Sequence, residues 1–417
     1  MAKLEKDRVI LRELAARVAE VAALPVQEEK KRLWKALNGL KPERPMVTID
    51  QVCWNEMDID GKLVLRCEDP ECRDYEERFR RILFQWEYFP VDMVVEPSIK
   101  VPRAVTNTGF GITNQEHTLV TAGKEGVASH QYINQFNSMD DLEKIKTPKV
   151  SHDVNETRRR MEFADWLFNG IMPLREEMPD VYGAPFNLSI WDPISSWMSV
   201  EGALYGLIDD PDMMHAMAKR IAGCLIAMLD QMEEQGLLFQ SQATIHCTGA
   251  FTDDLPAPGF DPAKPRTRDI WMYGLAQMFA TVSPAMFDEY EINYMMPIFE
   301  RFGLVYYGCC DPLDGKMKEV RKIPHLRKVS MSPWANKERG AEGIGRDYVF
   351  SNKPNPAYIA FSSFNEETVR NDLKETKEIC RRYGCPLEFI FKDISTVNNE
   401  PERLKKWADI AMAVAAG

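Results

Sequence analysis

Short apolar runs alternate along this chain with long amphipathic stretches, and this alternation limits the folds that the chain can adopt. The runs are rich in strand-forming residues, whereas the stretches begin at plausible caps and end at glycine, as helices do. Repeated units of a strand followed by a helix build a parallel sheet. The pattern predicts eight strands, at Met46–Gln51, Val91–Glu96, Phe186–Trp191, Leu275–Val282, Leu304–Cys309, Arg327–Ser332, Tyr348–Ser351 and Glu388–Lys392.

A closed (β/α)8 TIM barrel is the simplest α/β architecture for this order, and a doubly wound open sheet is the alternative. Residues 1–44 show the periodicity of two helices, so we expect an N-terminal helical extension, a cap or a homodimer arm, before a barrel over 45–417. Residues 240–269 contain four prolines and two glycines without a helical period. Long loops in compact domains are usually functional, so we expect this one, after the third β/α unit, to be a lid over the barrel mouth.

The composition narrows the choice of partners and compartment. Of 417 residues, 45% are apolar, and the net charge is −12 without any block of lysine and arginine. A globular protein with a small organic substrate fits this balance, whereas nucleic acid and anionic membranes do not. Neither a signal sequence nor an apolar run of membrane-spanning length is present, so we expect a cytoplasmic protein. Its nine cysteines, an odd number, indicate free thiols or metal ligands rather than a disulfide framework.

In a barrel the active site lies at the carboxyl ends of the strands, where this sequence places several reactive side chains. Cys309 and Cys310 lie at such an end, and thiolates bind zinc, although many free cysteines are simply small buried hydrophobes. His246 and Cys247 in the proposed lid are the other candidate metal ligands. The remaining candidates are Glu96, Tyr307 and Asp393 for catalysis, and Trp54, Trp191, Asp192, Gln277, Trp334 and Lys353 for substrate binding. The three tryptophans would wall a flat ring, or alternatively pack as core and rim residues.

Motifs that define other enzyme classes are missing. The sequence has neither the phosphate-binding loop G-x-x-x-x-G-K-[ST] nor the hydrolase motif G-x-S-x-G. The stretch "TIHCTG" is similar to the corrinoid-binding signature D-x-H-x-x-G, but Thr244 stands where aspartate belongs and no glycine-rich region follows. We therefore expect that any corrinoid comes from a separate protein.

The order of longer motifs carries a family resemblance. The stretches "PVDMVVEP", "DPISSWMSVEGALYGLIDDPDMM", "DDLPAPGFDP", "YYGCCDPLDG", "SNKPNPA" and "KDISTVNNEPERLKKWADIA" together resemble the uroporphyrinogen decarboxylase-like superfamily over residues 45–417. Within it, the chain is most similar to corrinoid-dependent methyltransferases, including O-demethylase components. The resemblance implies a (β/α)8 barrel, a zinc ion at its mouth and a corrinoid protein that docks over that mouth.

The resemblance and the rim residues together predict transfer of a methyl group from a small donor, a methoxylated aromatic, to the cobalt of a separate corrinoid protein. The sequence departs from the family where H-x-C is expected, since Cys309 and Cys310 lack a neighbouring histidine. It also reads "TIDQVCWNEMD" where a porphyrinogen decarboxylase has R-Q-A-G-R, so that reaction is not expected. The alternatives are a metal-free decarboxylase or lyase, anchored by Lys353, Lys392 and Arg103, and a barrel that only binds a corrinoid protein.

Overall fold

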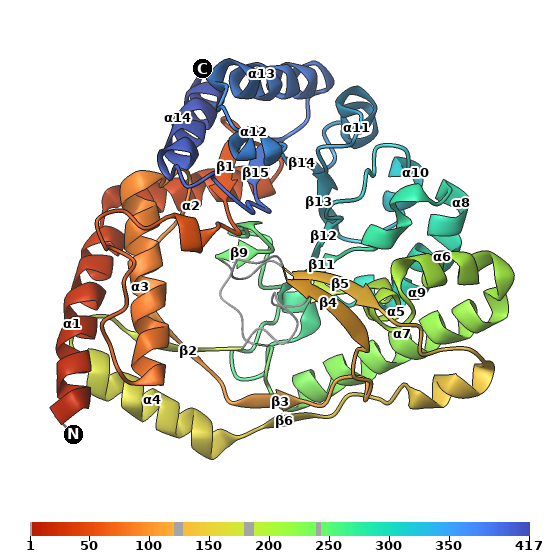
Figure 1. The fold of residues 1–417 in the computed structure, drawn as a ribbon, viewed down its shortest axis with the longest axis horizontal. Helices are drawn as coiled ribbons and strands as arrows, with labels where there is room; N and C mark the ends of the chain where they lie inside the picture. The colour runs from red at the N-terminus through yellow and green to blue at the C-terminus, as the bar shows by residue number, and fades with distance from the viewer. Residues whose placement is uncertain (1, 121–127, 179–186, 239–242) are drawn as a thin grey trace.

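The computed structural model describes residues 2–120, 128–178, 187–238 and 243–417 (Figure 1). Seven parallel strands form one curled sheet, in the order β1-β15-β14-β13-β12-β11-β8. The first strand therefore lies beside the last, as in a barrel. The strands are β1 (Met46–Ile49), β8 (Asn187–Leu188), β11 (Trp271–Gly274), β12 (Leu304–Tyr307), β13 (Leu326–Met331), β14 (Val349–Asn352) and β15 (Leu387–Phe391).

Helices surround this sheet on its outer side, and short strand pairs complete the structure. The longer helices are α1 (Ala2–Ala22), α2 (Pro25–Asn38), α3 (Pro70–Tyr88), α4 (Val154–Phe168), α5 (Trp191–Met198), α6 (Val200–Asp209), α7 (Pro211–Glu234), α9 (Asn293–Phe299), α11 (Lys337–Ile344), α13 (Glu366–Tyr383) and α14 (Glu402–Ala416). The short pairs are β2 (Ile99–Pro102) with β7 (Leu174–Glu177), β3 (Val105–Asn107) with β6 (Val150–His152), β4 (Glu116–Val120) with β5 (Ala128–Tyr132), and β9 (Thr244–Ile245) with β10 (Thr248–Gly249). In the described ranges, no helix is both long and apolar enough to cross a membrane.

The predicted parallel α/β fold is confirmed, but the barrel is not closed. Between β1 and β8, within the described ranges, no strand joins the seven-stranded sheet, although Val91–Glu96 was expected there. The reason lies in Asp92, whose carboxylate accepts hydrogen bonds from Val47 N, at 2.8 Å, and from the guanidinium of Arg44. A side chain thus takes the backbone N–H that a neighbouring strand would need for its ladder.

Two further strand predictions were wrong in position or length. Leu275–Val282 is not a strand, because β11 ends at Gly274 and Gln277–Thr281 forms a 3-10 turn. In the predicted Phe186–Trp191, Phe186 lies outside the described residues, Asn187–Leu188 form β8, and Trp191 already begins α5. The other five predicted strands agree with the structure within two residues at each end.

The two faces of the sheet bury different side chains, as the period of two in a strand requires. Outward-facing residues such as Met272, Tyr307 and Phe389 belong to the main hydrophobic core beneath the helices. Inward-facing residues such as Tyr273 and Tyr306 belong to a smaller cluster in the hollow of the sheet. Side chains therefore fill the middle of the hollow, so a reaction can take place only at its ends.

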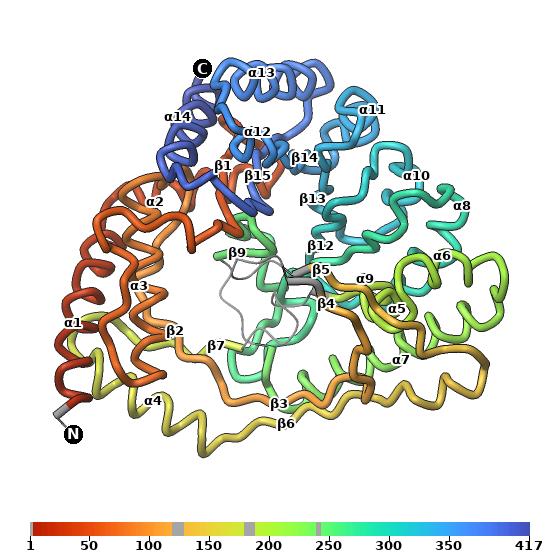
Figure 2. The backbone as a smooth tube through the Cα atoms, in the orientation of Figure 1, coloured from red at the N-terminus to blue at the C-terminus, as the bar shows by residue number. Residues whose placement is uncertain are grey.

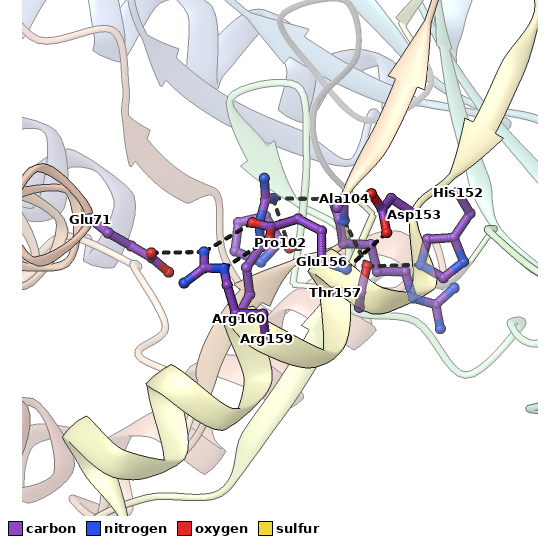
Figure 3. Close-up of polar contacts among 10 residues, drawn as sticks. Glu71, Pro102, Ala104, His152, Asp153, Glu156, Thr157, Arg159 and Arg160 are labelled. Carbon is purple, nitrogen blue, oxygen red and sulfur yellow. Dashed lines mark hydrogen bonds and ion pairs between the residues drawn. The ribbon is translucent and has the colours of Figure 1, made fainter.

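The N-terminal helices pack against the rest of the chain rather than standing apart. Helix α1 lies along α3 and α4 and shares a second apolar cluster with them (Figure 2). At the start of α4, Asp153 caps the helix by accepting from Glu156 N, and Arg159 joins Glu156 to Glu71 of α3 at 2.9 Å (Figure 3). In the same view Ala104 N donates to Thr157 Oγ1, which ties α4 to the chain after β2.

The described part of the predicted lid passes through the hollow instead of covering it. Its β9–β10 hairpin turns at the carboxyl ends of the strands, but Ala250 O then accepts from Trp271 Nε1 at the start of β11. Asp254 pairs with Arg327 near the start of β13, at 2.7 Å. The lid prediction was therefore wrong for this stretch, because Ile245, Thr248 and Ala250 bury themselves inside the sheet. Residues 240–242 of the predicted segment lie outside the described residues.

Candidate active site

A two-residue turn brings His246 and Cys247 to the carboxyl ends of the strands. The β9–β10 register pairs Ile245 with Thr248, so His246 and Cys247 occupy the turn with φ values of 27° and 55°. Glycine and asparagine are the usual residues there, and other residues cost about 1–3 kcal/mol each. The surroundings hold the strained turn in place, since the His246 ring stacks on Tyr273 with centroids 3.9 Å apart. Strain held in this way is typical of functional sites.

A second corner places the adjacent thiols. Strand β12 ends at Tyr307, and Gly308 follows with φ 94°. A Cβ at Gly308 would lie 2.4 Å from Leu313 Cδ1, so only glycine fits. The backbone of Cys309 is then fixed from two sides, because its carbonyl oxygen accepts from Ser330 Oγ at 2.7 Å and from Lys353 Nζ at 3.0 Å.

The two corners meet in a group that we call the thiol cluster: His246, Cys309, Cys310, Lys392 and Asp393. Cys309 Sγ lies 3.5 Å from Cys310 Sγ, 3.8 Å from His246 Nε2 and 3.3 Å from Lys392 Nζ. Lys392 Nζ also lies 3.4 Å from His246 Nε2, and Cys310 Sγ lies 3.7 Å from Asp393 Oδ2. One sulfur thus contacts a thiol, an imidazole and an ammonium group.

These contacts separate the pKa values of the two thiols. The hydrogen bond from Cys310 holds the pKa of Cys309 far below its usual range, against the effect of burial and with help from Lys353, His246 and Lys392. The same contact raises the pKa of Cys310. Burial lowers the pKa of His246. These directions favour a thiolate at Cys309 over one at Cys310, and a neutral imidazole at His246.

Zinc binding by the predicted ligands stays a prediction, and the surroundings of these side chains bear on it. Across the described ranges, no group of three or more histidine, cysteine, aspartate and glutamate side chains could hold a metal ion. The ammonium group of Lys392 contacts both Cys309 Sγ and His246 Nε2, so a cation already lies against the two strongest candidate ligands. Burial also raises the pKa of Cys247, which opposes the thiolate that zinc requires.

Two cavities border this end of the sheet. The larger, of about 460 Å³, is lined by His246 and Cys247 on one side and by Thr48, Asp50 and Gln51 of the β1 end on the other. It occupies the region where the sheet is not closed.

The smaller cavity, of about 290 Å³, lies at the end of β8 and is lined by apolar, aromatic and polar side chains with one carboxyl group. Phe110 and Trp197 meet edge to face in its wall, with centroids 5.6 Å apart, and Ile112 adds to it. Burial raises the pKa of Asp192 to about 6, opposed by a hydrogen bond with Ser189 and aided by the negative charge of Cys309. This carboxyl group therefore keeps a proton much nearer to neutral pH than an exposed aspartate does.

Of the predicted site residues, the structure brings together Cys309, Cys310, His246, Asp393 and Lys353. Cys247 lies in the same turn as His246 and lines the larger cavity, Asp192 lines the smaller cavity, and the remaining residues lie elsewhere or face away. Tyr307 is fully buried on the helix side and donates to Glu291 Oε1 at 3.0 Å, and Glu96 pairs with Lys100 and Arg175. Trp191 is fully buried and donates to Tyr290 O, Trp54 packs on Phe84 and Phe89, Gln277 is exposed, and Trp334 is 73% exposed.

Sequence reasoning missed Tyr273 and considered Lys392 only as an anchor for the alternative reaction. Tyr273 was missed because the fourth strand was placed too late in the sequence. A signal for Lys392 is present in the strand itself, because Glu388, Ile390 and Lys392 share one face by the period of two, and Glu388 and Lys392 are too polar for an outward face beneath helices.

Comparisons with known proteins add little to this site. No family model and no curated protein sequence matches the chain. Among solved structures it is similar to a methyltransferase from Methanosarcina mazei, with a TM-score of 0.48 and 12% sequence identity, over 91% of this chain and 97% of that chain. At this level the similarity assigns neither a function nor a residue role.

Proposed function

We propose that the protein is a methyltransferase that moves a methyl group from a methoxylated aromatic to the cobalt of a separate corrinoid protein. The observation that carries this proposal is the β8 cavity, where a proton-holding carboxyl group lies beside an aromatic wall. The resemblance of the sequence to corrinoid-dependent methyltransferases supports the same reaction class.

The chemistry explains why such a carboxyl group matters. The partner would supply a nucleophilic cobalt that takes the methyl group, so the bond between the methyl carbon and the aryl oxygen breaks. The leaving oxygen belongs to a phenol, whose pKa is about 10, and a proton delivered to it lowers the barrier. The Asp192 carboxyl, with its pKa raised to about 6, is a suitable donor and takes a new proton from water afterwards.

The walls of the cavity suit the rest of such a donor. Phe110 and Trp197 offer an edge and a face to an aromatic ring, and each such contact contributes about 0.5–1.5 kcal/mol beyond burial. Asn114 and Ser196 line the same cavity and offer hydrogen bonds to ring substituents. A ring held here would present its ether oxygen to Asp192.

The test mixes this protein with a reduced corrinoid protein and a panel of methoxylated aromatics and follows the cobalt absorbance. We expect the reduced spectrum to change to the methylated one, and Asp192→Asn to slow this change about 100-fold or more. Asp409→Asn is the matched control, because it makes the same change at an exposed aspartate on α14, away from the cavity. A panel of methyl ethers, methylamines and methyl thiols that leaves the cobalt unchanged would remove the proposal.

One observation favours the alternative of a decarboxylase or lyase. Lys353 and Lys392 are both 3% exposed and converge on Cys309, where they could bind a substrate carboxylate. Release of carbon dioxide from a carboxylated substrate, lost in Lys353→Met, would support this reaction instead. Zinc is a separate prediction from the sequence, and elemental analysis of the anaerobically purified protein tests it.

A further inference from the structure

We propose that Cys309 is a nucleophilic thiolate site, held by Lys392 rather than by a metal, that reacts with small soft electrophiles at carbon. This site is distinct from the β8 cavity and does not depend on the methyl-transfer proposal. The sequence predicts that the same sulfur binds a metal. The charges around Cys309 decide between a metal ligand and a nucleophile.

The thiol cluster must balance the positive charges of its buried lysines. Two buried lysines, Lys353 and Lys392, approach Cys309, yet in the described ranges the only carboxylate that forms an ion pair with either is Asp393, 3.3 Å from Lys392 and half exposed. A buried ammonium group without a counter-charge is costly. The sulfur of Cys309, 3.3 Å from Lys392 Nζ, is the group placed to supply the second negative charge, because a thiolate accepts from an ammonium group more strongly than a neutral thiol does.

The two adjacent cysteines differ in their exposure and in the charges beside them. Cys310 is more exposed than Cys309, but its sulfur faces the Asp393 carboxylate at 3.7 Å rather than a lysine. Exposure alone therefore predicts that Cys310 reacts first, whereas the surrounding charges predict Cys309. The reactivities of Cys309 and Cys310 can therefore be compared within a single peptide.

Cys309 lies near a cavity, and its backbone is held in place. Cys309 is 4% exposed and does not itself line the 460 Å³ cavity, but His246, whose Nε2 lies 3.8 Å from its sulfur, does, so a small reagent in that cavity lies one side chain away from the sulfur. The Cys309 backbone is held by Ser330 and Lys353, and this restricts the sulfur to one orientation. A positioned, desolvated thiolate beside a cation is the usual arrangement of a nucleophilic cysteine.

Iodoacetamide is the probe for this reaction. The thiolate attacks the CH2 carbon, a carbon–sulfur bond forms, the carbon–iodine bond breaks and iodide leaves. The full-length protein, reduced under anaerobic conditions, is treated at pH 7 with a small excess of reagent, and mass spectrometry follows the labelling of each cysteine. We expect Cys309 to be labelled about tenfold or more faster than Cys310, as a difference of one pKa unit between the thiols would give.

Variants separate the role of Lys392 from general damage. Lys392→Met should slow labelling of Cys309 about tenfold, and Lys392→Arg, which keeps the charge, should restore most of the rate. Lys405→Met is the matched control, because Lys405 is exposed on α14 and pairs with Asp409. The thermal transition of each variant shows whether it is folded.

Three results would overturn the inference: faster labelling of Cys310 than of Cys309, an unchanged rate in folded Lys392→Met, or protection of Cys309 by one bound metal ion that a chelator removes. A Cys309–Cys310 disulfide that persists after reduction would overturn it too. None of these measurements uses a corrinoid, so this inference can fail while methyl transfer is observed, and the reverse.

Discussion

Lys328 and Lys392 are two buried lysines in the hollow of the same sheet, and their surroundings differ in kind. Lys328 Nζ donates to Glu388 Oε2 at 2.8 Å, to Thr248 Oγ1 at 3.1 Å and to Gly249 O at 3.1 Å, so all three of its protons are bonded to oxygen. Lys392 Nζ lies 3.3–3.4 Å from a sulfur, an imidazole nitrogen and a half-exposed carboxylate. All the protons of Lys328 are therefore bonded to strong acceptors, whereas those of Lys392 face weaker ones.

The pKa directions of the two lysines follow this difference. Burial lowers the pKa of Lys328, and Glu388 only partly opposes it. Burial also lowers the pKa of Lys392, but the charges of Cys309, Cys247 and Asp393 outweigh it and raise the value. A fully bonded buried charge stabilises one conformation, whereas a weakly bonded one at the mouth is available to a reactant.

The largest expected effect comes from breaking the buried ion pair between Lys328 and Glu388. Lys328→Met leaves Glu388 buried without its cation, and we expect a loss of about 3–5 kcal/mol in the free energy of unfolding. Chemical denaturation followed by circular dichroism measures it. Lys392→Met should lose less than half as much, because Cys309 can take up a proton when its counter-charge is removed. Equal losses in the two variants would contradict the distinction drawn between the lysines.

The corner that holds Cys309 gives the next largest effect. Gly308→Ala should cost about 2–4 kcal/mol, because alanine at φ 94° is strained and its Cβ would lie 2.4 Å from Leu313 Cδ1. Gly170→Ala is a matched control, since Gly170 has φ 81° and nothing within 4 Å of an added Cβ, and it should cost about 1 kcal/mol. The difference in denaturation midpoints between the two variants isolates the clash from the strain.

A smaller effect is expected at the carboxyl group of the β8 cavity. The pKa of Asp192 is raised from 3.8 to about 6, so the folded protein binds this proton more tightly than the unfolded chain does. The stability that the proton contributes is present at low pH and is lost as pH rises through 3.8 to about 6. Asp192→Asn removes this dependence, so the wild type should lose about 2–3 kcal/mol relative to the variant across that range. Thermal denaturation of both proteins at several pH values measures the difference, and parallel curves would contradict it.

The smallest effect is expected at the exposed end of the thiol cluster. Asp393 is half exposed and has φ 57°, a conformation that asparagine adopts as readily. Asp393→Asn should therefore change the free energy of unfolding by less than about 0.5 kcal/mol, because the ion pair with Lys392 is screened by solvent. A loss comparable with that of Lys328→Met would show that the mouth is as tightly bonded as the middle of the hollow.

The sequence predicts the fold well where strands form a continuous ladder. The apolar runs at β12, β13, β14 and β15 are bordered by turn residues, and each strand has hydrogen-bonded neighbours on both sides. The run at Val91–Glu96 looks similar, but one carboxylate, that of Asp92, takes the N–H of Val47. Composition and periodicity carry no information about such a single side-chain contact.

The same limit applies to the candidate site. Cys309, Cys310 and His246 can be found from the sequence because soft, reactive side chains stand next to turns. The contact between Lys392 and Cys309 joins residues 83 positions apart, and only the curl of the sheet brings them together. The proton-holding character of Asp192 likewise depends on the cavity around it, not on its neighbours in sequence.

The passage of the β9–β10 hairpin through the hollow also sets an order of events during synthesis. Thr248 meets Glu388 across a separation of 140 residues, and β1 pairs with β15. At about 5–20 residues per second, the ribosome needs roughly 10–30 s to make that intervening chain. Throughout this interval the turn at His246 and Cys247 lacks part of the framework that holds it, so the nascent thiols meet the cell's reductants and oxidants before they meet Lys392.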